Sequence, residues 1–184
     1  MKQLDELSLV ELWRMFPIKL VKHRTCWHAW FKTEETLLKS IIPTEAKVHH
    51  IGSTATLSIL SKPIIDILVE AEHGSFAAIR SMLTLNGYTL MSDTNTRCSL
   101  NKGYTPKGYE KRIFHLHLRR FHDNDELYFR DYLNEYPTVA KEYETIKLAL
   151  YRQYKYDRDE YTKGKASFVH EYTEKAIQKY GRVY

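Results

Sequence analysis

The amino-acid sequence predicts a mixed α/β fold (α+β), in which a mixed β-sheet is flanked by helices and followed by a helical C-terminal part. Three observations predict it. The run PIIDILV at residues 63–69 is almost continuously apolar, which is typical of a strand buried on both faces. Helical and strand periods alternate before residue 121, and from about Asp123 only the helical period continues. The 184 residues contain no linker, so we expect a single domain over 1–184.

The N-terminal quarter predicts two helices and one strand. The letters SLVE at 8–11 have the form of a capping box, which predicts a short helix over 8–15. Apolar residues spaced three and four apart predict an amphipathic helix over 25–42, which ends before a proline. The alternating, β-branched character of AKVHHI at 46–51 predicts a short strand, which the following glycine ends.

The middle of the chain predicts a helix and four strands. The central strand over 63–69 is followed by a helical period over 75–87, whose final Asn-Gly is typical of a C-cap. Three further strands are expected over 88–91, 96–102 and 110–120, the last two separated by a turn-rich connection. These segments give the mixed sheet.

The C-terminal third predicts helices only. One begins in the acid-rich start of 123–136, a second follows Pro137, and a final helix begins near Asp159. Tyrosines recur here at near-helical spacing, which is typical of a core whose hydroxyls reach the surface.

Composition excludes several classes of protein. The 43% hydrophobic and 13% aromatic content is globular, and no apolar run approaches the roughly 20 residues of a membrane helix. The N-terminus carries acids where a secretory signal needs a basic start. Two cysteines are too few for a disulfide framework, which favours a reducing compartment. We therefore expect a soluble, cytoplasmic protein without a membrane partner.

The net charge of +5 is concentrated in one segment. Residues 102–120 hold six Lys or Arg against Glu110. Such a segment attracts phosphates, or is simply the solvated rim of a loop and a strand, and the sequence leaves both readings open.

A Gly-Ser turn precedes the acid of the central strand. A strand that ends in Gly52 and Ser53, a short connection and a central strand with Asp66 form the arrangement found in nucleotidyltransferase folds. The glycine lets the backbone approach a triphosphate, and Ser53, Thr54 and nearby N–H groups are candidate phosphate ligands. Asp66 is the candidate catalytic residue and Mg²⁺ ligand. Lys62 either contacts a phosphate or pairs with Asp66.

Histidines extend this candidate site. His115 and His117 alternate on one strand face, and with Asp66 and His50 they are candidate ligands of a divalent metal. Carboxylate ligation suits Mg²⁺ or Mn²⁺, whereas imidazole ligands favour Zn²⁺, Mn²⁺ or Fe²⁺ over Mg²⁺. The competing interpretation is that one histidine of each pair is a buried, hydrogen-bonded strand residue.

Two cationic positions in the helical part complete the candidates. Arg130 is expected to face the cleft, while the adjacent Asp131 points to another side of the same helix. Lys163 and Lys165 flank a glycine near a helix start and either bind an anion or are solvated.

The motif HHIGSTATLSILSKPIIDILVE at 49–70 resembles the signature of the GrpB-like family (UPF0157), whose usual form is HIGSTAVPGLxAKPIIDI. The resemblance continues in HLHL at 115–118, FRDYL at 129–133 and YTKGKASFV at 161–169. It implies a nucleotidyltransferase-like fold, found alone or fused to dephospho-CoA kinase in some bacterial proteins. It implies no established reaction.

The sequence departs from both patterns. Active nucleotidyltransferases usually carry a second acid two residues after the first, where this chain has Leu68. Glu70 lies on the same strand face as Asp66, but it is about 7 Å beyond the position of Leu68 along an extended strand. Thr56, Leu57 and Ser58 replace the usual VPG, which changes the connecting turn.

Three hypotheses of function follow. The first is a metal-dependent nucleotidyltransferase or nucleotide-binding protein, whose partner is a nucleotide or a phosphorylated small molecule. The second, favoured by Leu68, is a catalytically inactive binding or regulatory module linked to coenzyme A metabolism. The third, a nucleic-acid-associated protein, ranks last because no stretch interleaves aromatic and basic residues as a recognised nucleic-acid motif does. The sequence leaves a homodimer open.

Overall fold

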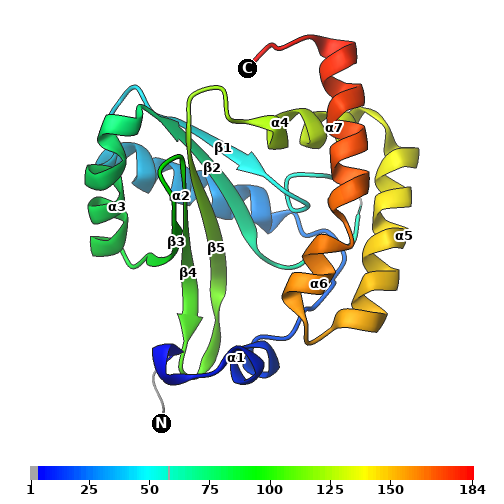
Figure 1. The fold of residues 1–184 in the computed structure, drawn as a ribbon, viewed down its shortest axis with the longest axis horizontal. Coiled ribbons are helices and arrows are strands. Elements are labelled where there is room, and N and C mark those ends of the chain that lie inside the picture. Colours follow the sequence, from blue (N-terminus) through cyan, green and yellow to red (C-terminus); the bar gives the residue numbers. More distant parts are fainter. Residues whose placement is uncertain (1–3, 58) are drawn as a thin grey trace.

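The computed structural model describes residues 4–57 and 59–184 and contains a five-stranded sheet (Figure 1). The strand order is β1-β2-β5-β4-β3, and the central pair β2 and β5 is parallel while the other pairs are antiparallel. The mixed sheet expected from the sequence is therefore confirmed. The strands are β1 (Lys47–Ile51), β2 (Ile65–Ala71), β3 (Thr89–Asp93), β4 (Arg97–Thr105) and β5 (Gly108–Arg120).

Helices precede, interrupt and follow the sheet. The capping box forms as expected at the start of α1, where the side chain of Ser8 accepts from the Glu11 N–H and the Glu11 carboxylate accepts from the Ser8 N–H. The expected last helix is two helices, α6 and α7. The α-helices are α1 (Leu9–Met15), α2 (Cys26–Ile41), α3 (Phe76–Leu85), α4 (Asp125–Glu135), α5 (Pro137–Tyr154), α6 (Arg158–Lys163) and α7 (Ala166–Tyr180).

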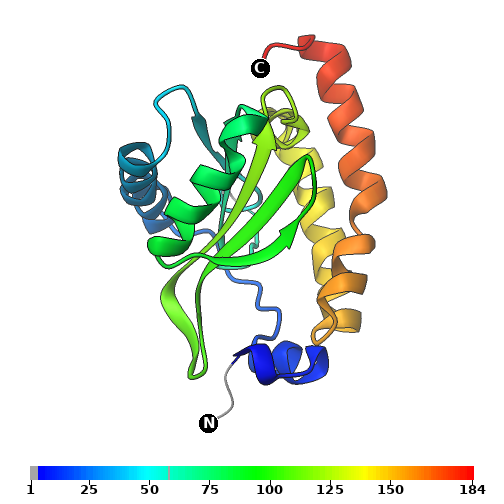
Figure 2. The ribbon, with the colours of Figure 1, turned by 60° about the vertical axis from the view of Figure 1, so that its left-hand side comes forward.

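The two faces of the sheet have different coverings. Figure 2 shows α2 and α3 on one side of the sheet and α5 and α7 on the other. On the α2 side, Ile65, Ile67 and Val69 of β2 pack in the main core with Trp27 and Leu38 of α2. Because side chains alternate along a strand, the even-numbered residues of β2 point to the helical C-terminal part.

The second face is polar where it is open and apolar where helices cover it. Leu68 is buried against Ile51 and Leu127, at the start of α4. Glu70 is also buried, and its carboxylate accepts hydrogen bonds from the His122 N–H and the Asn124 side chain, both at 2.9 Å. These bonds fix the turn that leads into α4, so they determine where α4 lies over the sheet.

Candidate functional site

A cleft of about 760 Å³ lies between the sheet and the helices α4, α6 and α7. Its floor carries Asp66 of β2 and His115 and His117 of β5, and the strand register places Asp66 directly beside His115. Gly52 and Ser53, at the end of β1, form part of the rim. The volume falls within the range of about 300–1,000 Å³ that is common for small-molecule pockets.

Gly52 lies directly against the carboxylate of Asp66. Its φ is +70°, a left-handed conformation that favours glycine. A Cβ atom at this position would lie 2.4 Å from Oδ2 of Asp66. Glycine therefore lets the end of β1 close onto the carboxylate.

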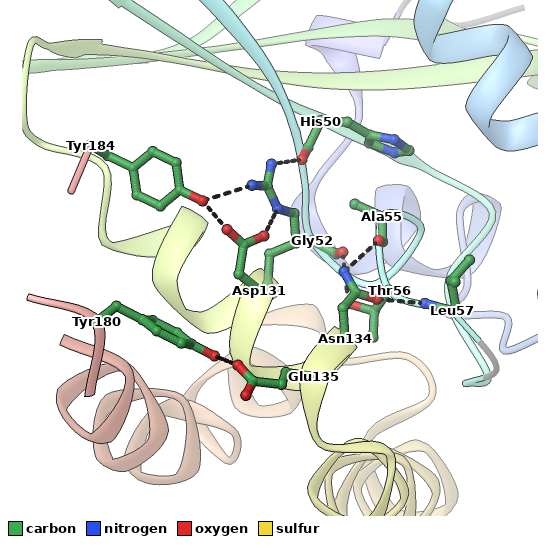
Figure 3. Close-up of polar contacts among 11 residues, drawn as sticks. His50, Gly52, Ala55, Thr56, Leu57, Asp131, Asn134, Glu135, Tyr180 and Tyr184 are labelled. Atoms are coloured by element: carbon green, nitrogen blue, oxygen red, sulfur yellow. Dashed lines mark hydrogen bonds and ion pairs between the residues drawn. The ribbon is translucent and has the colours of Figure 1, made fainter. Parts of the chain in front are cut away.

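Helix α4 holds the loop that follows Gly52 (Figure 3). The Asn134 side chain donates to the Ala55 carbonyl at 3.2 Å and accepts from the Leu57 N–H at 3.1 Å. Arg130, one turn earlier, donates to the carbonyl of His50 at 2.9 Å. The position of the Gly-Ser loop thus depends on side chains more than 70 residues away in the sequence.

A chain of polar side chains stabilises the charge of Asp66. Nδ1 of His115 lies 3.5 Å from Oδ1 of Asp66, and Nε2 of His115 lies 2.7 Å from the Tyr104 hydroxyl, which accepts from Arg158 at 3.2 Å. A proton on Nδ1 lets His115 donate to Asp66. Burial opposes ionisation, but the hydrogen bond and charge of His115, with the charge of Lys62, bring the pKa of Asp66 down to about 2.

Three lysines, Lys62, Lys147 and Lys165, gather beside the Gly-Ser loop, and we call them the lysine cluster. The Nζ atoms of Lys62 and Lys165 lie over the Tyr161 ring, at 5.8 and 4.7 Å from its centroid. Nζ of Lys147, which is 2% exposed, donates to Oγ of Ser53 at 3.3 Å and to the carbonyl of Leu60.

The lysines of the cluster repel one another and form no close ion pair with the described residues. Burial and the neighbouring lysines lower the pKa of Lys147 to about 7. Burial, followed by the charge of Lys62, lowers the pKa of Lys165 to about 7 as well. Within the part of the chain that the structure describes, no carboxylate lies within ion-pair distance of any of the three lysines. A bound anion would restore their ordinary protonation.

His50 does not join the other candidate ligands. It lies on the α2 face of β1, where its ring stacks on Phe31 at 4.7 Å and Nε2 lies 3.0 Å from the Thr54 hydroxyl. His50 was expected among the metal ligands. Adjacent residues of a strand point to opposite faces of the sheet, and His50 is on the face away from the cleft. Burial lowers the pKa of His50 to about 4, although the charge of Asp66 opposes this shift.

Three expected phosphate ligands have structural partners instead. Thr54 is buried and donates to the carbonyl of Ile64 at 3.2 Å. Arg130 lines the cleft, as expected, and also donates to the β1 carbonyl and to the neighbouring aspartate of its own helix. Lys163 is exposed and pairs within α6, whereas Lys165 lines the cleft. Of the two lysines in the TKGK sequence, Lys165 is therefore the candidate for binding an anion.

The basic segment 102–120 does not form one surface. Lys102 pairs with a buried glutamate of α2 at 2.7 Å, on the face away from the cleft. Arg119 pairs with a glutamate of α4 at 3.4 Å, and Arg120 donates to a loop carbonyl at 3.5 Å. Strand alternation divides these charges between the two faces, so the segment as a whole is not a phosphate site.

The residues present do not fit the expected divalent metal. Across residues 4–57 and 59–184, no three His, Cys, Asp or Glu side chains are grouped closely enough to hold an ion. Asp66 is the carboxylate of the cleft floor, and its Oδ1 lies 3.5 Å from Nδ1 of His115. The position of the usual second acid, Leu68, is fully buried under α4.

We expect the variant Leu68→Asp to destabilise the protein rather than to rebuild a metal site. The new carboxylate would lie in the apolar contact with Ile51 and Leu127, at a cost of at least about 3 kcal/mol. Urea unfolding with and without Mg²⁺ measures this effect, and Leu68→Met is the matched control. Recovery of wild-type stability in Leu68→Asp on addition of Mg²⁺ would contradict the expectation.

The sequence did not single out two cations, Arg158, which lines the cleft, and Lys147, which is buried beside Ser53. Lys147 comes from α5 and Arg158 from α6, and no local motif marks either as a ligand. Tyr143 and Lys147 lie on one face of α5, with Nζ of Lys147 at 4.8 Å from the Tyr143 ring centroid.

The fold matches that of nucleotidyltransferases. The structure of terminal uridylyl transferase 4 from Trypanosoma brucei with bound dUTP is similar over 93% of this chain and 57% of that one, with a TM-score of 0.54. The sequences are 11% identical, so this likeness concerns the fold alone. The chain thus has a nucleotidyltransferase-like fold.

Among the described residues, the helices are too short or too polar to span a membrane.

The chain belongs to the GrpB family, because the family model "GrpB protein" matches residues 17–175. The crystal structure of conserved protein GrpB from Enterococcus faecalis is 29% identical, covers 88% of this chain and 99% of that one, and has a TM-score of 0.76.

Curated relatives agree with this assignment. Glutamate-rich protein GrpB of Alkalihalophilus pseudofirmus is 34% identical over 83% of this chain and 91% of its own length. UPF0157 protein YqkA of Bacillus subtilis is 30% identical over 89% of this chain, but the chain spans about half, 48%, of that relative.

Proposed function

We propose that the cleft binds the phosphate groups of a nucleotide or of another phosphorylated small molecule, and that this binding needs no divalent metal. The observation that carries the proposal is the lysine cluster, three half-buried or buried cations without a carboxylate partner beside Ser53. Buried charges are normally paired, so an unpaired cluster in a cleft favours an anionic ligand.

The cluster suits phosphate in chemistry as well as in charge. Ammonium groups and a serine hydroxyl donate hydrogen bonds to phosphate oxygens, and Ser53 already lies 3.3 Å from Nζ of Lys147. Arg158 lines the same cleft and adds a further cation. These groups supply the positive charge that Mg²⁺ supplies elsewhere, which supports binding without a metal.

A second candidate function is metal-dependent nucleotidyl transfer. One observation favours it: Asp66 stays ionised, with a pKa of about 2, at the point where the Gly-Ser loop meets the floor of the cleft. The lack of a second carboxylate beside Asp66 counts against it, because Leu68 is buried. We therefore rank a binding or regulatory module above a transferase.

Calorimetric titration tests the proposal. Purified protein is titrated with ATP, ADP, dephospho-coenzyme A and pyrophosphate, in EDTA and in Mg²⁺. We expect at least one of these ligands to bind with similar affinity in EDTA and in Mg²⁺. Binding at pH 8 should also take up protons, because the phosphate raises the lowered pKa of Lys147 and Lys165. Buffers of different ionisation enthalpy measure that uptake.

Two results would contradict the proposal. Affinity that needs Mg²⁺ and disappears in Asp66→Asn would favour metal-dependent transfer and would justify a screen for acceptors. No heat with any phosphate ligand would reject a phosphate site altogether.

A further inference from the structure

The cleft has a second end with a different chemical character. Along β5, His115 and His117 line the cleft, and Arg119, the next residue on the same face of the strand, is buried beyond them. Lys62 precedes β2, so the lysine cluster lies at the end of the cleft where the parallel strands β2 and β5 begin. Arg97, His117 and Glu126 line the cleft toward the other end, beneath the start of α4.

Cations at this second end are paired, unlike those of the lysine cluster. Arg97 donates to both carboxylate oxygens of Asp123, at 3.0 and 2.7 Å. Arg119 donates to Glu126 at 3.4 Å. The charges here balance, so this end offers no excess attraction for a phosphate.

Hydrogen-bonding capacity nevertheless remains at this end. Arg119 is 8% exposed, and its Nε has no partner among the described residues. The imidazole of His117 lines this end, and its ring nitrogens are available for hydrogen bonds to a ligand. Glu126 adds acceptor oxygens. A neutral group with both donors and acceptors complements this set.

We propose that the end of the cleft formed by Arg97, His117 and Glu126 binds the uncharged nucleoside part of a nucleotide whose phosphates lie at the lysine cluster. This inference rests on the proposed function and adds the orientation of the ligand. Sugar hydroxyls and base edges each present donors and acceptors, which paired charges and an imidazole are able to match.

The apolar lining of the cleft suits such a ligand. Phe129 and Val169 line the cleft, and the Phe129 ring is held edge-on against Tyr143 at 5.2 Å. A cleft with a cationic end, an apolar wall and a polar end is complementary to a nucleotide, which has a charged end, a polar sugar and a flat base. A phosphate-only ligand would leave the second end without a partner.

Comparison of two ligands on two variants tests the orientation. Wild-type protein is titrated with inorganic tripolyphosphate and with ATP, GTP, CTP and UTP, and the nucleotide that binds most tightly is used further. We expect His117→Leu to weaken nucleotide binding about tenfold, because one hydrogen bond to the ligand is lost. The same variant should change tripolyphosphate binding less than about twofold. Lys165→Met should weaken both ligands alike. Arg97→Gln, at an exposed position, repeats the test should His117→Leu fail to fold.

The outcomes separate the two proposals. Equal effects of His117→Leu on both ligands, or no effect on either, would overturn the orientation while leaving the phosphate site in place. Nucleotides that bind no more tightly than tripolyphosphate would likewise overturn it. Wild-type protein that binds neither ligand would overturn the phosphate site itself, and the orientation with it.

Discussion

Replacement of Gly52 by alanine is expected to lower the free energy of unfolding by about 2–5 kcal/mol and to abolish ligand binding in the cleft. Two effects add at this position. The φ of +70° is unfavourable for any residue with a Cβ, and that Cβ would lie 2.4 Å from Oδ2 of Asp66. Either the loop or the carboxylate must move, and both belong to the site.

Two other glycines provide matched controls for Gly52→Ala. Gly87 has a φ of +85°, but a Cβ there would meet only the Lys102 side chain at 3.9 Å, so Gly87→Ala should cost about 1–2 kcal/mol. Gly74 has open space around it, and Gly74→Ala should be close to neutral. Chemical denaturation measures all three. If Gly52→Ala is as stable as Gly87→Ala or more stable, the contact of the added Cβ with Asp66 does not lower the free energy of unfolding.

Replacement of Lys165 by methionine should stabilise the ligand-free protein and weaken phosphate binding at least tenfold. Methionine keeps the apolar contact with the Tyr161 ring but removes a desolvated charge that makes no described ion pair. The folded-state pKa of about 7 lies below the unfolded value near 10.4, so the folded protein binds fewer protons between these two values. The penalty is therefore complete below pH 7 and fades as the pH rises toward 10.

The pH dependence distinguishes this effect from a general gain in stability. Because Lys165 keeps some contact with water, we expect Lys165→Met to gain about 1–2 kcal/mol at pH 6 and almost nothing at pH 9.5. Lys163→Met is the control: Lys163 is exposed and pairs within α6, so its replacement should change neither stability nor phosphate affinity appreciably. Thermal unfolding at several pH values measures the gain. A gain in Lys165→Met that is the same at both pH values would contradict the electrostatic explanation.

Much of the fold could be predicted because its signals are local. The apolar run around Asp66 predicted a central strand, and β2 is flanked by β1 and β5. The capping box predicted the start of α1. Division of the last helix into α6 and α7 was not predicted, because the break at Gly164 interrupts the helical period only slightly.

The candidate site was predictable only in part. Gly52, Ser53 and Asp66 belong to one motif, and the structure brings them together. Lys147 was not identified as a ligand because its role depends on how α5 packs against the Gly-Ser loop, which no local pattern encodes. His50 was misplaced for the opposite reason, since a shift of one residue along a strand changes the face of the sheet.

The parallel pairing of β2 with β5 has a consequence for folding. Asp66 and His115 are neighbours in the sheet although 49 positions separate them in the chain, and the segment between them forms a helix and two further strands. Pairing over such a distance is slow, because a long loop must close before the contact forms. The floor of the cleft therefore completes late, and a ligand that binds it recognises only chains that have finished folding. Refolding followed through ligand binding should lag behind refolding followed through helix formation.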